Sequence, residues 1–400
     1  MVSFAAERDS EFATTRAHTP YVAAIDAGTN SCRILVGAVN IVNIYRNYFK
    51  LRSLDDRQVR IVDSYSRIVG LGEGLTQTGR LSKEGMDRTL EALSVCRERL
   101  SLHRVERMRA VATEACRQAE NADELVERAL RETGIRLEVI SPPEEAQLVL
   151  KGCMRVMSNE HAYGVMLDIG GGSTEIIWVK SQNIRNIPKP TQTIMDSISL
   201  PYGVVTLRDM YEHGGGKAAY DRAQQDIGDR IHSFMAKNNI SPAVVRKHAQ
   251  VIASSGSVST LASLVLGTPR YERRLIDGND FLAKDLQRVG TDLIERYLEQ
   301  KVPLVSAEED VTQEFLSQRM ADLSLAQALS STDPLLHARI GLLAAGSIIL
   351  NAVLSALDPV SIRIADRGVR EGLLNQLAES YKDQQTGGDG EPPTYTTLYW

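Results

Sequence analysis

The chain has 400 residues, of which 43% are hydrophobic and 24% are charged, and its formal net charge is −5. This length allows two or three domains with a sizeable core. The acidic balance argues against nucleic-acid binding through bulk positive charge. The four cysteines, Cys32, Cys96, Cys116 and Cys153, form no CxxC pair. They fit a reduced, cytoplasmic compartment and do not fit a structural zinc site.

The ends of the chain and its most apolar segment predict no membrane attachment. Residues 1–20 are polar, lack the apolar core of a signal peptide and are expected to be disordered. Residues 384–400 have the composition of a flexible tail. The most apolar segment, 340–357, is interrupted by polar residues and glycine, so it predicts a buried helix and not a membrane span.

Strands and helices alternate along the chain, which is typical of an α/β fold with mixed sheets. Strands are expected at 21–49, where two of them enclose the turn DAGTNS, and at 60–72, 107–113, 135–140, 163–179, 249–254 and 360–366. Helices are expected at 82–103, 119–134, 144–157, 217–238, within 280–357 and at 370–383. The glycine-rich stretch HGGGK, 213–217, follows no strand and is interpreted as a loop in preference to a phosphate cradle.

One strand–turn–strand motif occurs twice in the same phase. Its two copies share four residue types, Asp26, Gly28, Ser31 and Ile34 in the first and Asp168, Gly170, Ser173 and Ile176 in the second. This agreement favours duplication of one structural unit. We therefore expect two lobes, 21–146 and 147–383, with the closing helix of the second free to pack on the first.

The two motifs have the composition of phosphate-binding loops. Glycine lets a ligand approach backbone N–H groups, and successive N–H groups turned to one side form an anion nest. Asp168 and Asp26 come at the ends of the preceding strands, where a carboxylate would repel phosphate unless a divalent cation lies between them. Mg²⁺ often bridges one or two carboxylates to phosphates. Two Asp-Gly loops facing each other would hold a phosphate chain from both sides.

Each motif also has a purely structural interpretation. Aspartate and glycine are common in tight turns, although the three glycines of 170–172 exceed what a turn needs. Thr113, Glu114 and Arg117 fit either an anion site at a helix start or a helix with an exposed arginine. Glu144 and Glu145 are favoured in the first turn of a helix by its dipole alone.

Seven blocks, taken together and in this order, resemble the exopolyphosphatase and guanosine pentaphosphate phosphohydrolase (Ppx/GppA) family. They are AIDAGTNSCRILV, VATEACRQAEN, EVISPPEEAQLVLKG, GVMLDIGGGSTEIIWV, SLPYGVVTL, IASSGSVSTLA and IADRGVREGLL, and they span about residues 21–381. The resemblance implies an α/β fold of two ribonuclease H-like lobes, as in the actin-like ATPase superfamily, with mixed sheets around a central cleft. The chain resembles the short, two-domain form, because it ends without the C-terminal domain of the long members.

The resemblance also implies an activity and a set of residues. The expected reaction is release of terminal orthophosphate from inorganic polyphosphate, or of the 5′-γ-phosphate from guanosine pentaphosphate, with Mg²⁺ or alternatively Mn²⁺. Glu145 matches the general base, and Asp168 and Glu175 match acids associated with the metal and the attacking water, with Asp26 as a further acid at the metal. The implied phosphate-binding residues are Asp26, Gly28, Thr29, Asn30, Ser31, Arg33, Arg117, Gly170, Gly171, Gly172, Ser173, Thr174, Ser255, Gly256 and Ser257.

Two departures from the family pattern and two other functions remain open at this point. Gln147 replaces a family arginine, and Glu114 stands where a smaller polar residue is common. The alternatives are a sensor that binds guanosine tetra- or pentaphosphate without turnover and an ATP-dependent kinase of the same superfamily. The expected partners are polyphosphate, pppGpp or ppGpp and a second copy of the chain, with neither nucleic acid nor membrane.

Overall fold

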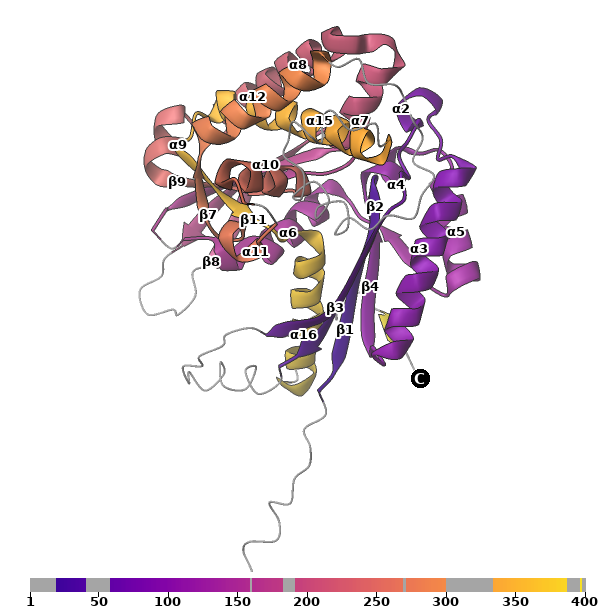
Figure 1. Ribbon diagram of the computed structural model, residues 1–400. Coiled ribbons are helices and arrows are strands. Elements are labelled where there is room, and N and C mark those ends of the chain that lie inside the picture. Colours follow the sequence, from indigo (N-terminus) through magenta and orange to yellow (C-terminus); the bar gives the residue numbers. More distant parts are fainter. Residues whose placement is uncertain are drawn as a thin grey trace, which may run out of the picture.

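The computed structural model describes residues 19–40, 58–158, 160–182, 191–268, 271–299, 334–386 and 396–397. Two mixed β-sheets lie in separate lobes, and helices cover their faces (Figure 1). The strand expected at 40–49 lies outside the described residues except for Asn40.

The first sheet has the order β12-β4-β1-β2-β3, and β5 pairs with β4. Its strands are β1 (Tyr21–Ala27), β2 (Ser31–Val39), β3 (Val59–Ile68), β4 (Arg107–Ala112), β5 (Leu137–Val139) and β12 (Thr396–Thr397). The helices in this part of the chain are α2 (Leu75–Thr78), α3 (Lys83–Leu102), α4 (Glu114–Gln118), α5 (Ala122–Thr133) and α6 (Pro142–Cys153). Alternate residues of β1 point to opposite faces, so Ala23 and Ile25 pack beneath α3 while Val22 and Ala24 face the second lobe.

The second sheet has the order β10-β11-β9-β6-β7-β8. Its strands are β6 (Tyr163–Ile169), β7 (Thr174–Gln182), β8 (Thr191–Leu200), β9 (Ala249–Ser254), β10 (Asp280–Leu282) and β11 (Ser361–Ala365). Its helices are η1 (Met154–Val156), α7 (Val204–Met210), η2 (Tyr211–Gly215), α8 (Gly216–Lys237), α9 (Pro242–His248), α10 (Gly256–Leu266), α11 (Arg273–Ile276), α12 (Ala283–Glu299), α15 (Pro334–Leu357) and α16 (Val369–Thr386).

The duplication expected from the motifs is confirmed by the strand register. Asp26 pairs with Arg33 across β1 and β2, and Asp168 pairs with Glu175 across β6 and β7, so both residues of the pair shift by 142 positions. The same shift relates the hydrogen bonds of the two turns, from Gly28 N–H to Ser31 O at 3.0 Å and from Gly170 N–H to Ser173 O at 2.9 Å. It also relates the two β-bulges, at Val36/Gly37 and at Trp178/Val179. The two hairpins therefore share their backbone geometry.

Helices α6 and α16 pack between the two sheets. Their apolar residues form one core with Val22 and Leu35 of the first sheet and Met166 of the second. The helices approach closely, since a Cβ on Gly152 would lie 2.1 Å from the backbone oxygen of Gly368. The boundary expected at residue 146 falls inside α6, and α16 lies against β1, β2 and β4 of the first lobe (Figure 1).

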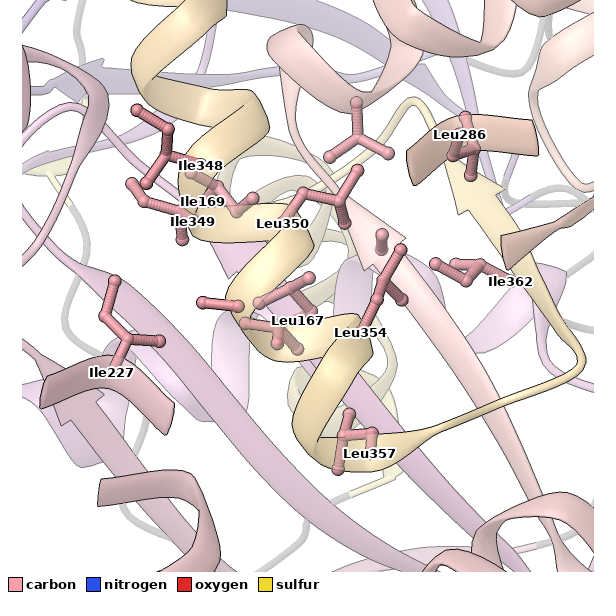
Figure 2. Close-up of a cluster of buried hydrophobic side chains, with 14 of the residues drawn as sticks. Leu167, Ile169, Ile227, Leu286, Ile348, Ile349, Leu350, Leu354, Leu357 and Ile362 are labelled. Atoms are coloured by element: carbon pink, nitrogen blue, oxygen red, sulfur yellow. The ribbon is translucent and has the colours of Figure 1, made fainter. Parts of the chain in front are cut away.

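Helix α15 is the central helix of the second lobe. Figure 2 shows its residues Leu350 and Leu354 among side chains of the sheet and the surrounding helices, including Leu167 and Leu286. Among the described residues it is the one helix long and apolar enough to cross a membrane. However, 83% of its apolar segment, Arg339–Leu357, is buried inside the structure. The prediction of a buried helix over 340–357 is confirmed.

Two local expectations differ from the structure. The stretch 213–217 was expected as a loop, but η2 is a π-helical turn that continues into α8, so this prediction was wrong. The tail expected from residue 384 begins inside α16, which extends to Thr386. Thr396 and Thr397 then pair with β4 as a short antiparallel strand.

Candidate active site between the lobes

Four carboxylates from both lobes meet at one place. Asp26 and Asp168 are the next-to-last residues of β1 and β6, and Glu175 faces Asp168 from β7. Glu145 lies in the first turn of α6. Ser141 caps the start of this helix, because its hydroxyl accepts a hydrogen bond from the Glu144 N–H.

Burial and mutual repulsion raise the pKa values of these acids. Burial first, and the charge of Glu175 second, raise the pKa of Glu145 to about 8. Burial and the charge of Glu145 raise the pKa of Asp168 to about 7, and burial and the charge of Asp168 raise the pKa of Glu175 to about 7. Burial also raises the pKa of Asp26. The negative charge of at least one of these acids affects the pKa of another, so the predicted catalytic acids form a single cluster. Repulsion within such a cluster favours binding of a cation.

Several side chains act on these acids, and of them Ser199, Ser254 and Arg370 were not predicted from the sequence. Ser199 donates a hydrogen bond to Glu175 Oε1 at 2.9 Å, and a hydrogen bond with Ser254 lowers the pKa of Asp168. The positive charges of Arg33 and Arg370 oppose the rise in the pKa of Asp26. Arg370 lies in the sequence block IADRGVREGLL, where the only signal was its position at the start of a helix.

The two glycine loops touch each other. A Cβ on Gly171 would lie 2.9 Å from Thr29 Cβ and 3.0 Å from Asn30 N, and a Cβ on Gly172 would lie 2.7 Å from Thr29 Oγ1. Gly203 packs behind the second loop, where a Cβ would lie 2.3 Å from the carbonyl carbon of Gly171. Part of the glycine requirement therefore comes from the contact between the lobes and not from a ligand.

The loop carbonyls are bound by the protein, and several loop N–H groups are not. Gly170 O and Gly171 O accept hydrogen bonds from the first N–H groups of α7, at 3.0 and 2.8 Å. Thr29 O and Asn30 O accept from residues 69–72. Within the described part of the chain, the N–H groups of Thr29, Asn30, Gly171, Gly172 and Ser173 donate to no protein acceptor. Unpaired N–H groups from both lobes are the donor set that an oxyanion requires.

Several other predicted phosphate ligands are already engaged by the protein. Ser173 donates to Glu175 at 2.7 Å, Thr174 donates to the Tyr202 backbone oxygen at 2.6 Å, and Ser31 accepts from Arg33 Nε at 2.7 Å. The third predicted loop, Ser255, Gly256 and Ser257, begins α10 directly after β9, beside β6, and Ser255 caps that helix by accepting from the Ser257 N–H. It lies at the same sheet edge as Asp168, because Asp168 pairs with Ser254.

Arg117 binds two acids. Its Nε and Nη2 donate to Glu114 Oε2 at 2.9 and 2.6 Å, and its Nη1 donates to Glu145 Oε2 at 2.7 Å. The adjacent acid Glu144 pairs with Arg109 instead, and Gln147 is exposed. Arg117 therefore orients Glu145 in this structure, in addition to the phosphate role predicted for it.

A second contact between the lobes lies beside α7. The Gly74 N–H donates to Asp209 Oδ2 at 3.2 Å, and Glu73 lies 3.8 Å from Arg208 Nη2. Glu145 and Glu175 are only 7% and 2% exposed. The lobes are therefore in contact beside the acid cluster, and two of its acids have little exposed surface.

The acid cluster does not form a complete set of protein ligands for a metal ion. Among the described residues, no three histidine, cysteine, aspartate or glutamate side chains are placed to hold one ion. Asp168 and Glu175 nevertheless face each other across β6 and β7, and both have raised pKa values. Such a pair fits Mg²⁺, which keeps water ligands and binds through one or two carboxylates together with substrate phosphates.

Comparisons with known proteins agree with this arrangement. Residues 52–381 match the Ppx/GppA phosphatase family. Exopolyphosphatase 2 of Mycobacterium tuberculosis H37Rv is 30% identical over 282 residues, which cover 68% of this chain and 77% of that protein. The guanosine-5′-triphosphate,3′-diphosphate pyrophosphatase of Vibrio vulnificus is 36% identical over 160 residues, which cover 40% of this chain and 29% of that protein.

Solved structures show the same fold. The crystal structure of the Aquifex aeolicus member of the Ppx/GppA family has a TM-score of 0.61 and 23% identity, and the match covers 92% of this chain and 99% of that one. An exopolyphosphatase-like protein has a TM-score of 0.65 and 23% identity, with 89% and 97% covered. The predicted fold class, two ribonuclease H-like lobes of α/β type, is confirmed.

Proposed function

We propose a function from the premise that the chain belongs to the Ppx/GppA phosphatase family. The proposal is hydrolytic release of terminal orthophosphate from inorganic polyphosphate, or of the 5′-γ-phosphate from guanosine pentaphosphate. The observation that carries it is the meeting of four acids, of which Glu145 and Glu175 are buried, with two facing loops in which several N–H groups have no acceptor among the described residues. The named relatives, an exopolyphosphatase and a guanosine pentaphosphate pyrophosphatase, support both substrates.

In this proposal the glycine loops bind the terminal phosphate. The N–H groups of Gly171, Gly172 and Ser173 face it from the second lobe, and those of Thr29 and Asn30 face it from the first. Phosphoryl transfer to water depends mainly on positioning and on compensation of charge, so fixed backbone donors are well suited to it. Closure of the lobes excludes bulk water from the reacting groups.

Glu145 is the proposed general base. Arg117 binds its Oε2, which orients the carboxylate and leaves Oε1 to accept a proton from the attacking water. Glu145 is only 7% exposed, and the charge of Glu175 contributes to the rise in its pKa. A pKa of about 8 means that added positive charge in the cluster is needed to ionise Glu145 fully at neutral pH.

Asp168 and Glu175, with Asp26 nearby, are the proposed metal-associated residues. When bound, Mg²⁺ would supply positive charge that offsets the charge developing on the phosphate. The hydroxyls of Ser173 and Ser199 keep Glu175 in place, and Ser254 lies beside Asp168 on the neighbouring strand.

One assay tests this function against its two alternatives. Purified protein with Mg²⁺ is given polyphosphate, guanosine pentaphosphate, or ATP with a panel of sugars, and orthophosphate, ADP and nucleotide binding are measured. Orthophosphate release from either of the first two substrates supports the proposal. Binding of the guanosine nucleotide without release indicates a sensor, and sugar-dependent ADP formation indicates a kinase.

A matched pair of variants tests the base. Glu145→Gln should lower the turnover number by a factor of about 10² to 10⁴ with little change in substrate binding. Glu144→Gln is the control, because Glu144 is the preceding residue of the same helix but pairs with Arg109. Glu145 is not the base if its glutamine variant turns over at the wild-type rate.

A further inference from the structure

The contacts of Arg117 leave it little capacity for a ligand. Two of its N–H groups go to Glu114 Oε2, one goes to Glu145 Oε2, and one goes to the Ile140 backbone oxygen at 2.9 Å. A guanidinium has five N–H donors, so one remains. Glu145 has a role in the proposed reaction, whereas Glu114 has none.

Glu114 lies against the second glycine loop. It begins α4 directly after β4, and its side chain is 14% exposed. A Cβ added to Gly172 would lie 3.0 Å from Glu114 Cγ and 3.1 Å from Glu114 Cβ. An acid therefore stands beside Gly172, whose N–H has no acceptor among the described residues, and this acid binds Arg117.

This placement opposes anion binding in two ways. The carboxylate repels a phosphate at the neighbouring loop, and it occupies two donors that a phosphate would otherwise receive. Bidentate contacts between arginine and an oxyanion are among the stronger hydrogen bonds in proteins. The Glu114 carboxylate therefore competes strongly with a phosphate for Arg117. A ligand with several charged phosphates can compensate through its other contacts, and a single orthophosphate cannot.

We propose that Glu114 sets the affinity and the selectivity of the phosphate site, because Arg117 exchanges Glu114 for a phosphate oxygen when a phosphate chain binds. This inference rests on the proposed binding of phosphate at the glycine loops. Glu114 favours chains over orthophosphate and thereby favours release of the product. It acts through Arg117, so it is a positioning residue and not a catalytic one.

The test compares Glu114→Gln with the wild-type chain. The dissociation constants of tripolyphosphate and orthophosphate are measured by calorimetry without metal, and KM, kcat and orthophosphate inhibition are measured with Mg²⁺. Glu114→Gln should bind orthophosphate on the order of tenfold more tightly, because the competing partner of Arg117 loses its charge, and should bind tripolyphosphate more tightly by a smaller factor, because the chain already compensates through its other contacts. The KM should fall, inhibition by orthophosphate should strengthen, and kcat should change far less than KM.

Two control variants separate this from a general charge effect. Glu120→Gln removes the same charge from an acid that is 71% exposed and pairs with Arg80, so both affinities should remain unchanged. Glu114→Asp keeps the charge and should retain wild-type affinities more closely than Glu114→Gln. A double variant, Glu114→Gln with Arg117→Lys, should lose most of the gain, because lysine lacks the planar fork that binds an oxyanion through two N–H groups.

The outcomes distinguish the two proposals. Normal phosphate release with unchanged affinities in Glu114→Gln overturns the role of Glu114 and leaves the hydrolase in place. Tighter anion binding without any release, in the variant and in the wild type, supports Glu114 and overturns the hydrolase. Weaker anion binding in Glu114→Gln overturns the exchange, because it shows that Glu114 supports the ligand. A wild-type chain that binds neither anion removes both.

Discussion

Replacing Glu145 with glutamine should stabilise the free protein while it abolishes most turnover. Glu145 is 7% exposed, and its pKa of about 8 lies well above that of an exposed glutamate. Ionising this carboxyl in the folded chain therefore costs free energy that an uncharged glutamine of the same shape does not. The amide oxygen of glutamine can still accept the hydrogen bond from Arg117 Nη1.

The magnitude follows from the difference between the folded and unfolded pKa values. Each pKa unit corresponds to about 1.4 kcal/mol, so a rise from 4.5 to about 8 sets an upper limit of about 5 kcal/mol. Below about pH 4 the carboxyl is protonated in both states and the cost is absent. As the pH rises from about 4.5 to about 8, the unfolded chain releases the proton while the folded chain retains it, and wild-type stability falls relative to the variant.

The assay is thermal or urea unfolding of both proteins, without divalent metal, at pH 5 and at pH 8.5. The variant should gain little at pH 5 and several degrees in Tm at pH 8.5. Glu144→Gln should show no such pH-dependent gain, since Glu144 pairs with Arg109 outside the acid cluster. An equal difference at the two pH values, or a less stable variant at pH 8.5, would refute a Glu145 carboxyl buried among like charges.

Three further predictions follow from the site and its supports. Asp168→Asn keeps a partner for Ser254 but removes a charge, so the Mg²⁺ concentration for half-maximal phosphate release should rise on the order of tenfold. An unchanged Mg²⁺ titration would show that Asp168 does not bind the metal. Gly203→Ala places a Cβ 2.3 Å from the backbone of Gly171, so urea unfolding should show a loss of at least about 2 kcal/mol. Gly228→Ala, in α8 with no atom within 4 Å of the added Cβ, should instead gain about 0.5 to 1 kcal/mol. Tripolyphosphate at 100 times its dissociation constant should raise the free energy of unfolding by about 2.7 kcal/mol, and the absence of a Tm shift would contradict binding to the folded chain.

The sequence was sufficient for the elements that obey local rules. Asp26 and Asp168 each follow a run of apolar residues and precede glycine, which predicts a strand end and a turn. The equal spacing of the two motifs predicted the shared strand register. Asp26 and Asp168 were predicted from the two motifs, and Glu145 and Glu175 from the resemblance. The structure brings all four together because three lie at strand ends and Glu145 lies at a helix start.

The contacts that decide what the site residues do were not predictable from spacing. Arg117 was expected to bind phosphate. Its pair with Glu114 is a local i,i+3 contact within α4, but its contact with Glu145 joins α4 to α6, which only the fold brings together. Arg370 is far from Asp26 in the sequence, so no local pattern connects them. The glycines at 171 and 172 indicated a close approach, but not that part of the space is taken by Thr29 of the other lobe.

The position of α16 constrains how the chain is made. Val22 and Leu35 of the first lobe form one core with Leu373 and Leu377, which are among the last helical residues to be synthesised. Roughly 230 residues separate the end of the first lobe from those leucines, and at about 5 to 20 residues per second their translation takes roughly 10 to 50 s. During this time the nascent first lobe carries an incompletely covered apolar face on the ribosome. Chains that terminate before α16 retain that face permanently, which makes them candidates for chaperone binding and proteolysis.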